Sequence, residues 1–167
     1  LDKDTSGAIV VARTSEAFEE LTAELRRREI ERVYVALVEG RMSAPTGTVD
    51  APIGRDPSRP TRRAVVPGGK HARTHYEVVR YYEDSDVSLL EVRLETGRTH
   101  QIRVHLAAIG HPVTGDATYG ATRRDLKVPR TFLHASKVVF THPTSGKRLE
   151  FEAPLPRDLL AVLDRLS

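Results

Sequence analysis

Cysteine and tryptophan are absent from this chain, and methionine occurs once. The lack of cysteine excludes disulfides, thiolate nucleophiles and cysteine-ligated zinc. No apolar run approaches the length that spans a bilayer, and no positively charged segment followed by an apolar one resembles an export leader. The composition therefore predicts no membrane partner, and a reducing, cytoplasmic setting is the simplest interpretation.

Lysine is scarce beside arginine, since 5 of the 26 basic residues are Lys and 21 are Arg. Arginine suits phosphate and can stack on bases, which favours a nucleic-acid partner, although codon bias in a GC-rich genome explains the same excess equally well. Local clustering is more informative. Residues 55–73 hold six basic side chains against Asp56 alone, and we expect either a solvated loop or an arm that binds a phosphate backbone. The six are Arg55, Arg59, Arg62, Arg63, Lys70 and Arg73.

The first third of the chain predicts two strands around a helix. With 167 residues, 39% hydrophobic and 29% charged, the chain fits one globular domain over residues 1–167. Residues 8–12 and 33–38 form short apolar runs, and the second is apolar on both faces, which is typical of a central strand. Between them we expect a helix capped by Ser15 and ending in the basic residues 26–28.

The remainder predicts two hairpins. Residues 74–82 and 87–95 are rich in β-formers and are separated by an acidic turn, and residues 132–141 and 149–153 flank a Pro-Thr-Ser-Gly turn. Both pairs are expected to be antiparallel.

Two further helices complete the expected fold. A helix at residues 99–109 would place Ile102, Leu106 and Ile109 on one face, and leucines over 159–166 indicate a closing helix. The predicted class is therefore α+β, with a mixed, mainly antiparallel sheet and a few flanking helices.

Three polar motifs follow one another along the chain: Leu-Asp-Lys-Asp-Thr-Ser-Gly at 1–7, Arg-Val-Tyr-Val-Ala-Leu-Val-Glu-Gly at 32–40, and Leu-Glu-Thr-Gly-Arg-Thr-His-Gln-Ile-Arg-Val-His at 94–105. In this order, and with Thr-His-Tyr at 74–76, they resemble the RluA/RluD family of RNA pseudouridine synthases, nearest to the RluD branch that acts on large-subunit ribosomal RNA. The family pattern has a His and an Arg before the Leu of the first motif. The resemblance therefore implies a pseudouridine synthase catalytic domain truncated at its N-terminus.

Residue type and spacing alone would make Asp2 a turn residue, Arg103 a surface arginine and Tyr34 a core tyrosine. The resemblance implies catalytic roles for all three. Asp2 takes the place of the catalytic nucleophile, and Arg103 that of the arginine paired with it, in a bidentate contact that favours the charged carboxylate. Tyr34 takes the place of the tyrosine that stacks on the target uracil and is a candidate for proton transfer.

Other side chains are expected to contact the substrate: Ile102, His100, Gln101, Arg98, Arg62 and Arg63. His100, His105 and His111 invite a metal hypothesis, but spacings of five and six do not bring three imidazoles to one helical face. The chain also lacks a P-loop and a Gly-x-Ser-x-Gly elbow. We expect no metal and no organic cofactor.

The resemblance predicts an isomerase that flips specific uridines out of RNA and converts them to pseudouridine, with no required protein partner. One alternative is a catalytically incomplete RNA-binding fragment, and another is a structural domain whose arginine content is genomic bias. Strands 8–12 and 33–38 would lack neighbours in a truncated domain. Such a fragment is expected to expose a sheet edge, to be inactive and to self-associate.

Overall fold

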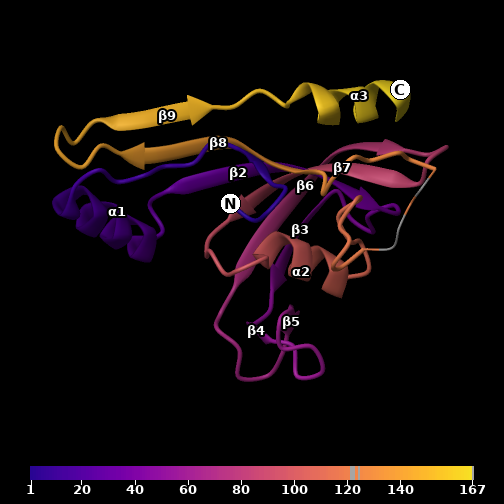
Figure 1. The fold of residues 1–167 in the computed structure, drawn as a ribbon, viewed down its shortest axis with the longest axis horizontal. Coiled ribbons are helices and arrows are strands. Elements are labelled where there is room, and N and C mark those ends of the chain that lie inside the picture. The colour runs from indigo at the N-terminus through magenta and orange to yellow at the C-terminus, as the bar shows by residue number, and fades with distance from the viewer. Residues whose placement is uncertain (121–122, 124, 167) are drawn as a thin grey trace.

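A computed structural model describes residues 1–166 except 121, 122 and 124. Within these residues, a seven-stranded sheet has the order β1-β8-β2-β7-β6-β3, and β9 pairs with β8 along the same edge as β1 (Figure 1). Strands β4 and β5 form a separate two-stranded sheet. The elements are β1 (Ser6–Gly7), α1 (Ser15–Arg27), β2 (Glu31–Glu39), β3 (Thr46–Asp50), β4 (Ile53–Arg55), β5 (Arg63–Val65), β6 (Arg73–Tyr82), β7 (Val87–Leu94), α2 (Gln101–Ala108), β8 (Leu133–Thr141), β9 (Arg148–Glu152) and α3 (Arg157–Leu166).

The large sheet is mixed and mainly antiparallel, because only β1 and β8 run parallel among the pairs described. The α+β class is confirmed, and both predicted hairpins are present as β6–β7 and β8–β9. β2 is central, as its apolar pattern predicted, since it pairs with β7 on one side and β8 on the other. No helix of the described chain is long and apolar enough to cross a membrane.

The strand expected at residues 8–12 was wrong. Pairing stops after Ser6 and Gly7, and the amide of Ala8 makes a last hydrogen bond to the carbonyl of Ala135. Beyond Ala135 that edge of β8 is occupied by β9, so the chain has no strand left to pair with, and Ile9 and Val11 face solvent.

The premise behind an exposed edge at β2 is likewise wrong, because both of its neighbours come from this chain. The expected inactivity and self-association of the chain rested on this premise, and the structure tests neither of them. Two helix details also differ from expectation. The side chain of Thr14, not that of Ser15, caps α1 by accepting the amide of Ala17, and Ile109 is 40% exposed because α2 ends before it.

The predicted basic loop contains regular structure. β4 and β5 form a short ribbon that projects beyond the large sheet beneath α2 (Figure 1), with Arg59 and Arg62 in the turn between the strands. Arg73 is not part of a free cationic arm, since it begins β6 and forms ion pairs with Asp50 and Glu95.

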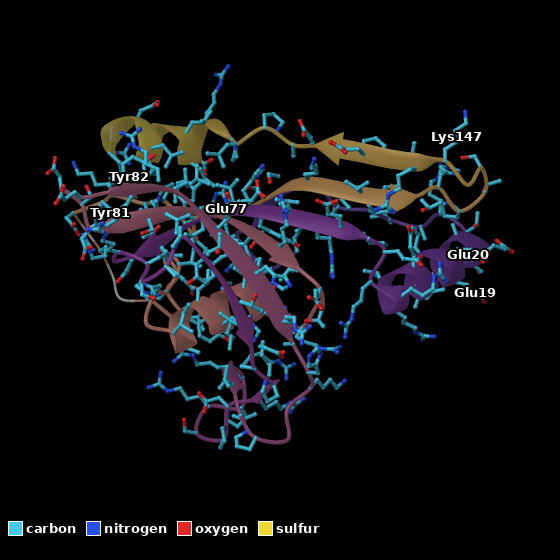
Figure 2. All side chains as sticks on the ribbon, turned by 180° about the vertical axis from the view of Figure 1, so that it is seen from behind. Glu19, Glu20, Glu77, Tyr81, Tyr82 and Lys147 are labelled. Carbon is cyan, nitrogen blue, oxygen red and sulfur yellow. The ribbon has the colours of Figure 1, made fainter. Side chains whose placement is uncertain are left out.

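The main core lies where β2 and β7 meet α2 and α3. Fully or nearly buried side chains from these elements include Leu37, Leu90, Ile102, Leu106 and Leu159. Because the core holds α2 against one face of the sheet, the polar groups of its first turn are fixed relative to β2. Figure 2 shows the rear of the molecule, where Glu77 lies on β6 opposite Glu91 of β7.

Candidate active site

Helix α2 is held at its first turn by the side chain of Gln101. Its Oε1 accepts hydrogen bonds from the Thr96 hydroxyl at 2.8 Å and the Arg98 amide at 3.0 Å. Its Nε2 donates to the carbonyl of Arg73 and to the Thr74 hydroxyl, both at 3.0 Å. The Gln101 side chain, expected to contact substrate, is therefore engaged in fixing the helix against β6.

Arg103 projects from α2 into a set of three hydrogen bonds with two carboxylates. Its Nη1 donates to Asp2 Oδ2 at 3.2 Å, so the Asp2–Arg103 ion pair is present as predicted. The bidentate contact expected for Asp2 is made with Asp116 instead, from Nε at 2.6 Å and from Nη2 at 3.0 Å. The fork of the guanidinium is thus fixed by Asp116, and its remaining nitrogen is directed at Asp2.

Asp116 was missed by the sequence analysis. Its side chain is fully buried, and Oδ1 also accepts the amides of Thr118 and Tyr119 at 2.8 and 3.1 Å. Burial acts to raise the pKa of Asp116, but the hydrogen bonds from Arg103 and the two amides outweigh it and lower that pKa. In the sequence, Asp116 follows Gly115 in a turn, and an Asp at such a position indicates only a turn cap. Nothing local predicts its contact with Arg103, thirteen residues earlier.

The segment that carries Asp2 is fastened to β8. Ser6 Oγ and His134 Nδ1 are 2.9 Å apart, and Arg130 donates to the carbonyl of Asp4 at 2.8 Å. Gly7, at a φ of 116°, lies so close to Ala135 that a side chain there would collide with the backbone. Since Ala135 is the β8 partner of Tyr34, this anchoring brings Asp2 to the same end of the sheet as Tyr34.

Asp2 and Tyr34 line one cavity of about 160 Å³. Four other predicted site residues line it as well: Arg98, His100, Gln101 and Ile102. Burial raises the pKa of Tyr34, with a smaller opposite effect from Arg32, so its phenol stays protonated at neutral pH. The cavity therefore combines a carboxylate, a protonated phenol and the apolar surface of Ile102.

Tyr119 connects this site to the β4–β5 ribbon. Its hydroxyl accepts the amide of Arg63 at 2.9 Å and lies 2.9 Å from His100 Nδ1. The guanidinium carbons of Arg62 and Arg103 lie 5.0 and 5.1 Å from the centre of its ring. Arg62 and Arg63, predicted to bind substrate, are thus on the ribbon outside the cavity and in contact with Tyr119.

The three histidines considered for a metal each have separate partners. His100 contacts Tyr119, His105 lies 2.9 Å from both Thr74 Oγ1 and the carbonyl of Ala51, and His111 lies 2.9 Å from the carbonyl of Glu39. In the part of the chain that the structure describes, no group of three His, Cys, Asp or Glu side chains is placed to hold a metal ion.

Comparison with known proteins gives this geometry a context. The sequence model of the family described as RNA pseudouridylate synthase matches residues 1–108. The chain belongs to this family. An uncharacterized RNA pseudouridine synthase of Chloroflexus aurantiacus is 52% identical over 167 residues, which are 100% of this chain and 52% of that protein. Ribosomal large subunit pseudouridine synthase D of Nitrosomonas europaea is 50% identical over 173 residues, covering 99% of this chain and 49% of that protein.

Solved structures of RNA pseudouridylate synthase domains share the fold. Human RNA pseudouridylate synthase domain containing 1 has a TM-score of 0.81 and 32% identity, covering 97% of this chain and 70% of that chain. Human RNA pseudouridylate synthase domain containing 4 has a TM-score of 0.79 at 24% identity, which supports the fold alone. The resemblance drawn from the three motifs is confirmed, and the chain spans about half the length of the curated relatives it matches.

Proposed function

We propose that residues 1–167 form the catalytic domain of an enzyme that converts uridine to pseudouridine in RNA. The observation that carries this proposal is the contact of Asp2 with Arg103 at a cavity shared with Tyr34. Three segments distant in the sequence contribute these side chains, and they are the three motifs that resemble the family. Ribosomal RNA of the large subunit is the substrate class we infer, because relatives such as the Nitrosomonas europaea protein carry that name. A cytoplasmic location would follow from that substrate.

The reaction is an internal rearrangement. The bond from ribose C1′ to N1 of uracil breaks, the base turns within the site, and a bond from C1′ to C5 forms. The C5 proton leaves and N1 gains a proton, so atoms and electrons balance without an oxidant, a reductant or a second substrate. Such a site needs a group that assists cleavage at the sugar, a surface that retains the detached base, and a route for the C5 proton.

The side chains in the cavity match these needs. Asp2 is 23% exposed and is directed by Arg103, so its free oxygen is available to a ribose held in the cavity. It serves either by attacking C1′ or by removing a sugar proton on a glycal route, and both routes use the same carboxylate. The ring of Tyr34 and the side chain of Ile102 provide surface for the base. Because the uracil must reach Asp2, the nucleotide is flipped out of its stack.

Replacement of Asp2 tests the proposal. RNA carrying tritium at C5 of uridine releases the label to water when C5 bonds to C1′, so tritium release measures turnover. Asp2→Asn removes the charge with little change in volume and should lower turnover on the order of 1,000-fold or more, with RNA affinity largely unchanged.

Asp4→Asn is the matched control, because Asp4 lies two residues away at a φ of 68°, which Asn also tolerates, and only its carbonyl contacts Arg130. This variant should retain turnover. An Asp2→Asn protein that releases tritium at nearly the wild-type rate would refute the role of Asp2. RNA binding by a wild-type protein that releases no tritium would favour the alternative of a binding fragment without catalysis.

A further inference from the structure

Arg32 is a cation of the cavity that the proposed mechanism does not use. It precedes Tyr34 by two residues on β2, so both side chains lie on the same face of the sheet, and both line the cavity with Asp2. Its Nη2 donates a long hydrogen bond of 3.4 Å to the carbonyl of Leu94. The Nε of Arg32 is buried and has no hydrogen-bond partner among the described residues.

The nearby carboxylates are engaged with other cations. Asp2 contacts Arg103, and Glu95 forms ion pairs with Arg28 and Arg73 and lies 2.7 Å from His75 Nε2. Arg32 makes no ion pair with any residue that the structure describes. Burying an arginine without a compensating charge is costly, and burial accordingly lowers the pKa of Arg32, although its guanidinium remains charged.

The guanidinium of Arg32 lies against Gly97, in space that a side chain at position 97 would occupy. A Cβ built on Gly97 would lie 2.6 Å from Arg32 Nη1, so any larger residue at position 97 would displace the guanidinium. Gly97 itself precedes Arg98, whose side chain is fixed by a hydrogen bond from Nε to the carbonyl of His71 at 2.9 Å. The loop between β7 and α2 therefore limits where the Arg32 guanidinium can lie.

A second hollow begins at Arg32. This groove of about 390 Å³ shares Arg32, Gly97 and Arg98 with the cavity and extends toward the end of α1. Its other charged or titratable lining residues are Arg26, Arg28, His71 and Glu95. Cations therefore predominate along a groove that borders the cavity with Asp2.

We propose that Arg32 binds a phosphodiester group of the RNA strand next to the nucleotide that enters the cavity. The assignment rests on the proposed function, since it takes RNA as the ligand. A phosphate accepts paired hydrogen bonds from a planar guanidinium, and it would supply the negative charge that Arg32 lacks in the protein. A strand lying in the groove would place its backbone at Arg32 while the flipped base occupies the cavity.

The test is RNA affinity as a function of salt, measured on the full chain with a large-subunit ribosomal RNA transcript. Arg32→Gln should weaken binding about tenfold or more and reduce the slope of log affinity against log salt by about 1, because one phosphate contact is lost. Arg32→Lys should restore the slope and only part of the affinity, since lysine keeps the charge but not the fork.

Arg93→Gln is the matched control. Arg93 lies on β7 opposite Val33 and therefore on the other face of the sheet, where it pairs with Glu91. It should leave affinity and slope nearly unchanged. If Arg32→Gln fails to fold, Gly97→Ala provides a second variant, which displaces the guanidinium and should weaken binding in the same direction.

Three results would overturn the assignment. The first is an equal effect of Arg32→Gln and Arg93→Gln on RNA affinity, and the second is unchanged RNA binding by Arg32→Gln. The third is a tritium-release assay in which Arg32→Gln has an unchanged KM but a lower kcat, which would place Arg32 on the detached uracil instead. A wild-type chain that neither binds RNA nor releases tritium would refute the proposed function itself, which separates the two failures.

Discussion

The two walls of the cavity differ in how their charges are satisfied. Behind the α2 wall, Arg103 is 8% exposed, its hydrogen bonds go to Asp2 and the fully buried Asp116, and its guanidinium lies against the ring of Tyr119. On the β2 wall, Arg32 has a single long hydrogen bond, and its buried Nε has no hydrogen-bond partner among the described residues. The hydrogen bonds and charge of Arg103 are thus satisfied within the protein, whereas Arg32 retains unpaired hydrogen-bond donors that a ligand can use.

This difference separates residues that build the site from residues that meet the ligand. A buried ion pair that loses one member leaves an uncompensated charge, so substitutions on the α2 wall should lower the free energy of unfolding as well as activity. Groups on the β2 wall have few partners to lose. Substitutions there should change binding or turnover at nearly constant stability.

Asp116→Asn should have the largest effect on stability. It keeps the volume of the side chain but removes the charge that faces both Nε and Nη2 of Arg103. We expect the free energy of unfolding to fall by about 3–5 kcal/mol, measured by denaturant titration, and turnover to fall with it because Arg103 no longer directs Asp2.

Glu91→Gln is the control for Asp116→Asn, since Glu91 pairs with Arg93 on the solvent-exposed rear face, and we expect a cost of about 0–1 kcal/mol. The pH dependence provides a second check. The pKa of Asp116 is lowered by folding, so its contribution is present above the unfolded pKa of about 3.9 and is lost as pH falls through the lower folded value. A wild-type protein and an Asp116→Asn variant of equal stability at neutral pH would contradict the contrast between the walls.

Tyr34→Phe should have the next largest effect, and on turnover alone. The change keeps the ring that faces the base and removes a hydroxyl that burial keeps protonated. We expect tritium release to slow about 100-fold if the hydroxyl takes part in proton transfer, with RNA affinity nearly constant. Tyr34→Ala should lose affinity as well, because it removes the stacking surface.

Tyr76→Phe is a matched control for Tyr34→Phe. Tyr76 pairs with Val92 of β7, which in turn pairs with Tyr34, but Tyr76 does not line the cavity. Turnover should be unchanged in Tyr76→Phe. Full turnover in both Tyr34→Phe and Tyr34→Ala would return Tyr34 to an ordinary core position.

Sequence pattern was sufficient where neighbours in sequence are also neighbours in space. The two hairpins, the central strand β2 and helix α2 were predicted because alternation, turn residues and helix stops are local signals. The strand at residues 8–12 failed for a non-local reason, since its apolar residues are suitable for a strand but β9 already occupies the edge of β8. The β4–β5 ribbon was missed because prolines and glycines obscured its short strands.

The same distinction applies to the site. Asp2, Tyr34 and Arg103 were identified because the family resemblance links three motifs that the chain separates. Asp116 escaped notice because its turn position explained it locally, and Arg32 because an arginine at the start of a strand usually faces solvent. Both became visible only through contacts: Asp116 accepts two hydrogen bonds from Arg103, and the buried Nε of Arg32 has no hydrogen-bond partner among the described residues.

Tyr119→Phe should have the smallest effect. Tyr119 lies between the α2 wall and the β4–β5 ribbon. The substitution removes the hydroxyl that accepts the amide of Arg63 and contacts His100, while the ring beneath Arg62 remains. We expect a loss of about 1 kcal/mol and an Arg63 amide that exchanges its hydrogen about fivefold faster, with β2 amides unaffected. Tyr81→Phe is the control, because its hydroxyl bonds to Asp86 at the surface far from the ribbon, and it should leave Arg63 exchange unchanged. An unaltered rate of hydrogen exchange at the Arg63 amide in Tyr119→Phe would show that the Tyr119 hydroxyl does not hold the β4–β5 ribbon. The hydrogen-bonded network around Arg103 would then extend to Asp116 but not to the ribbon.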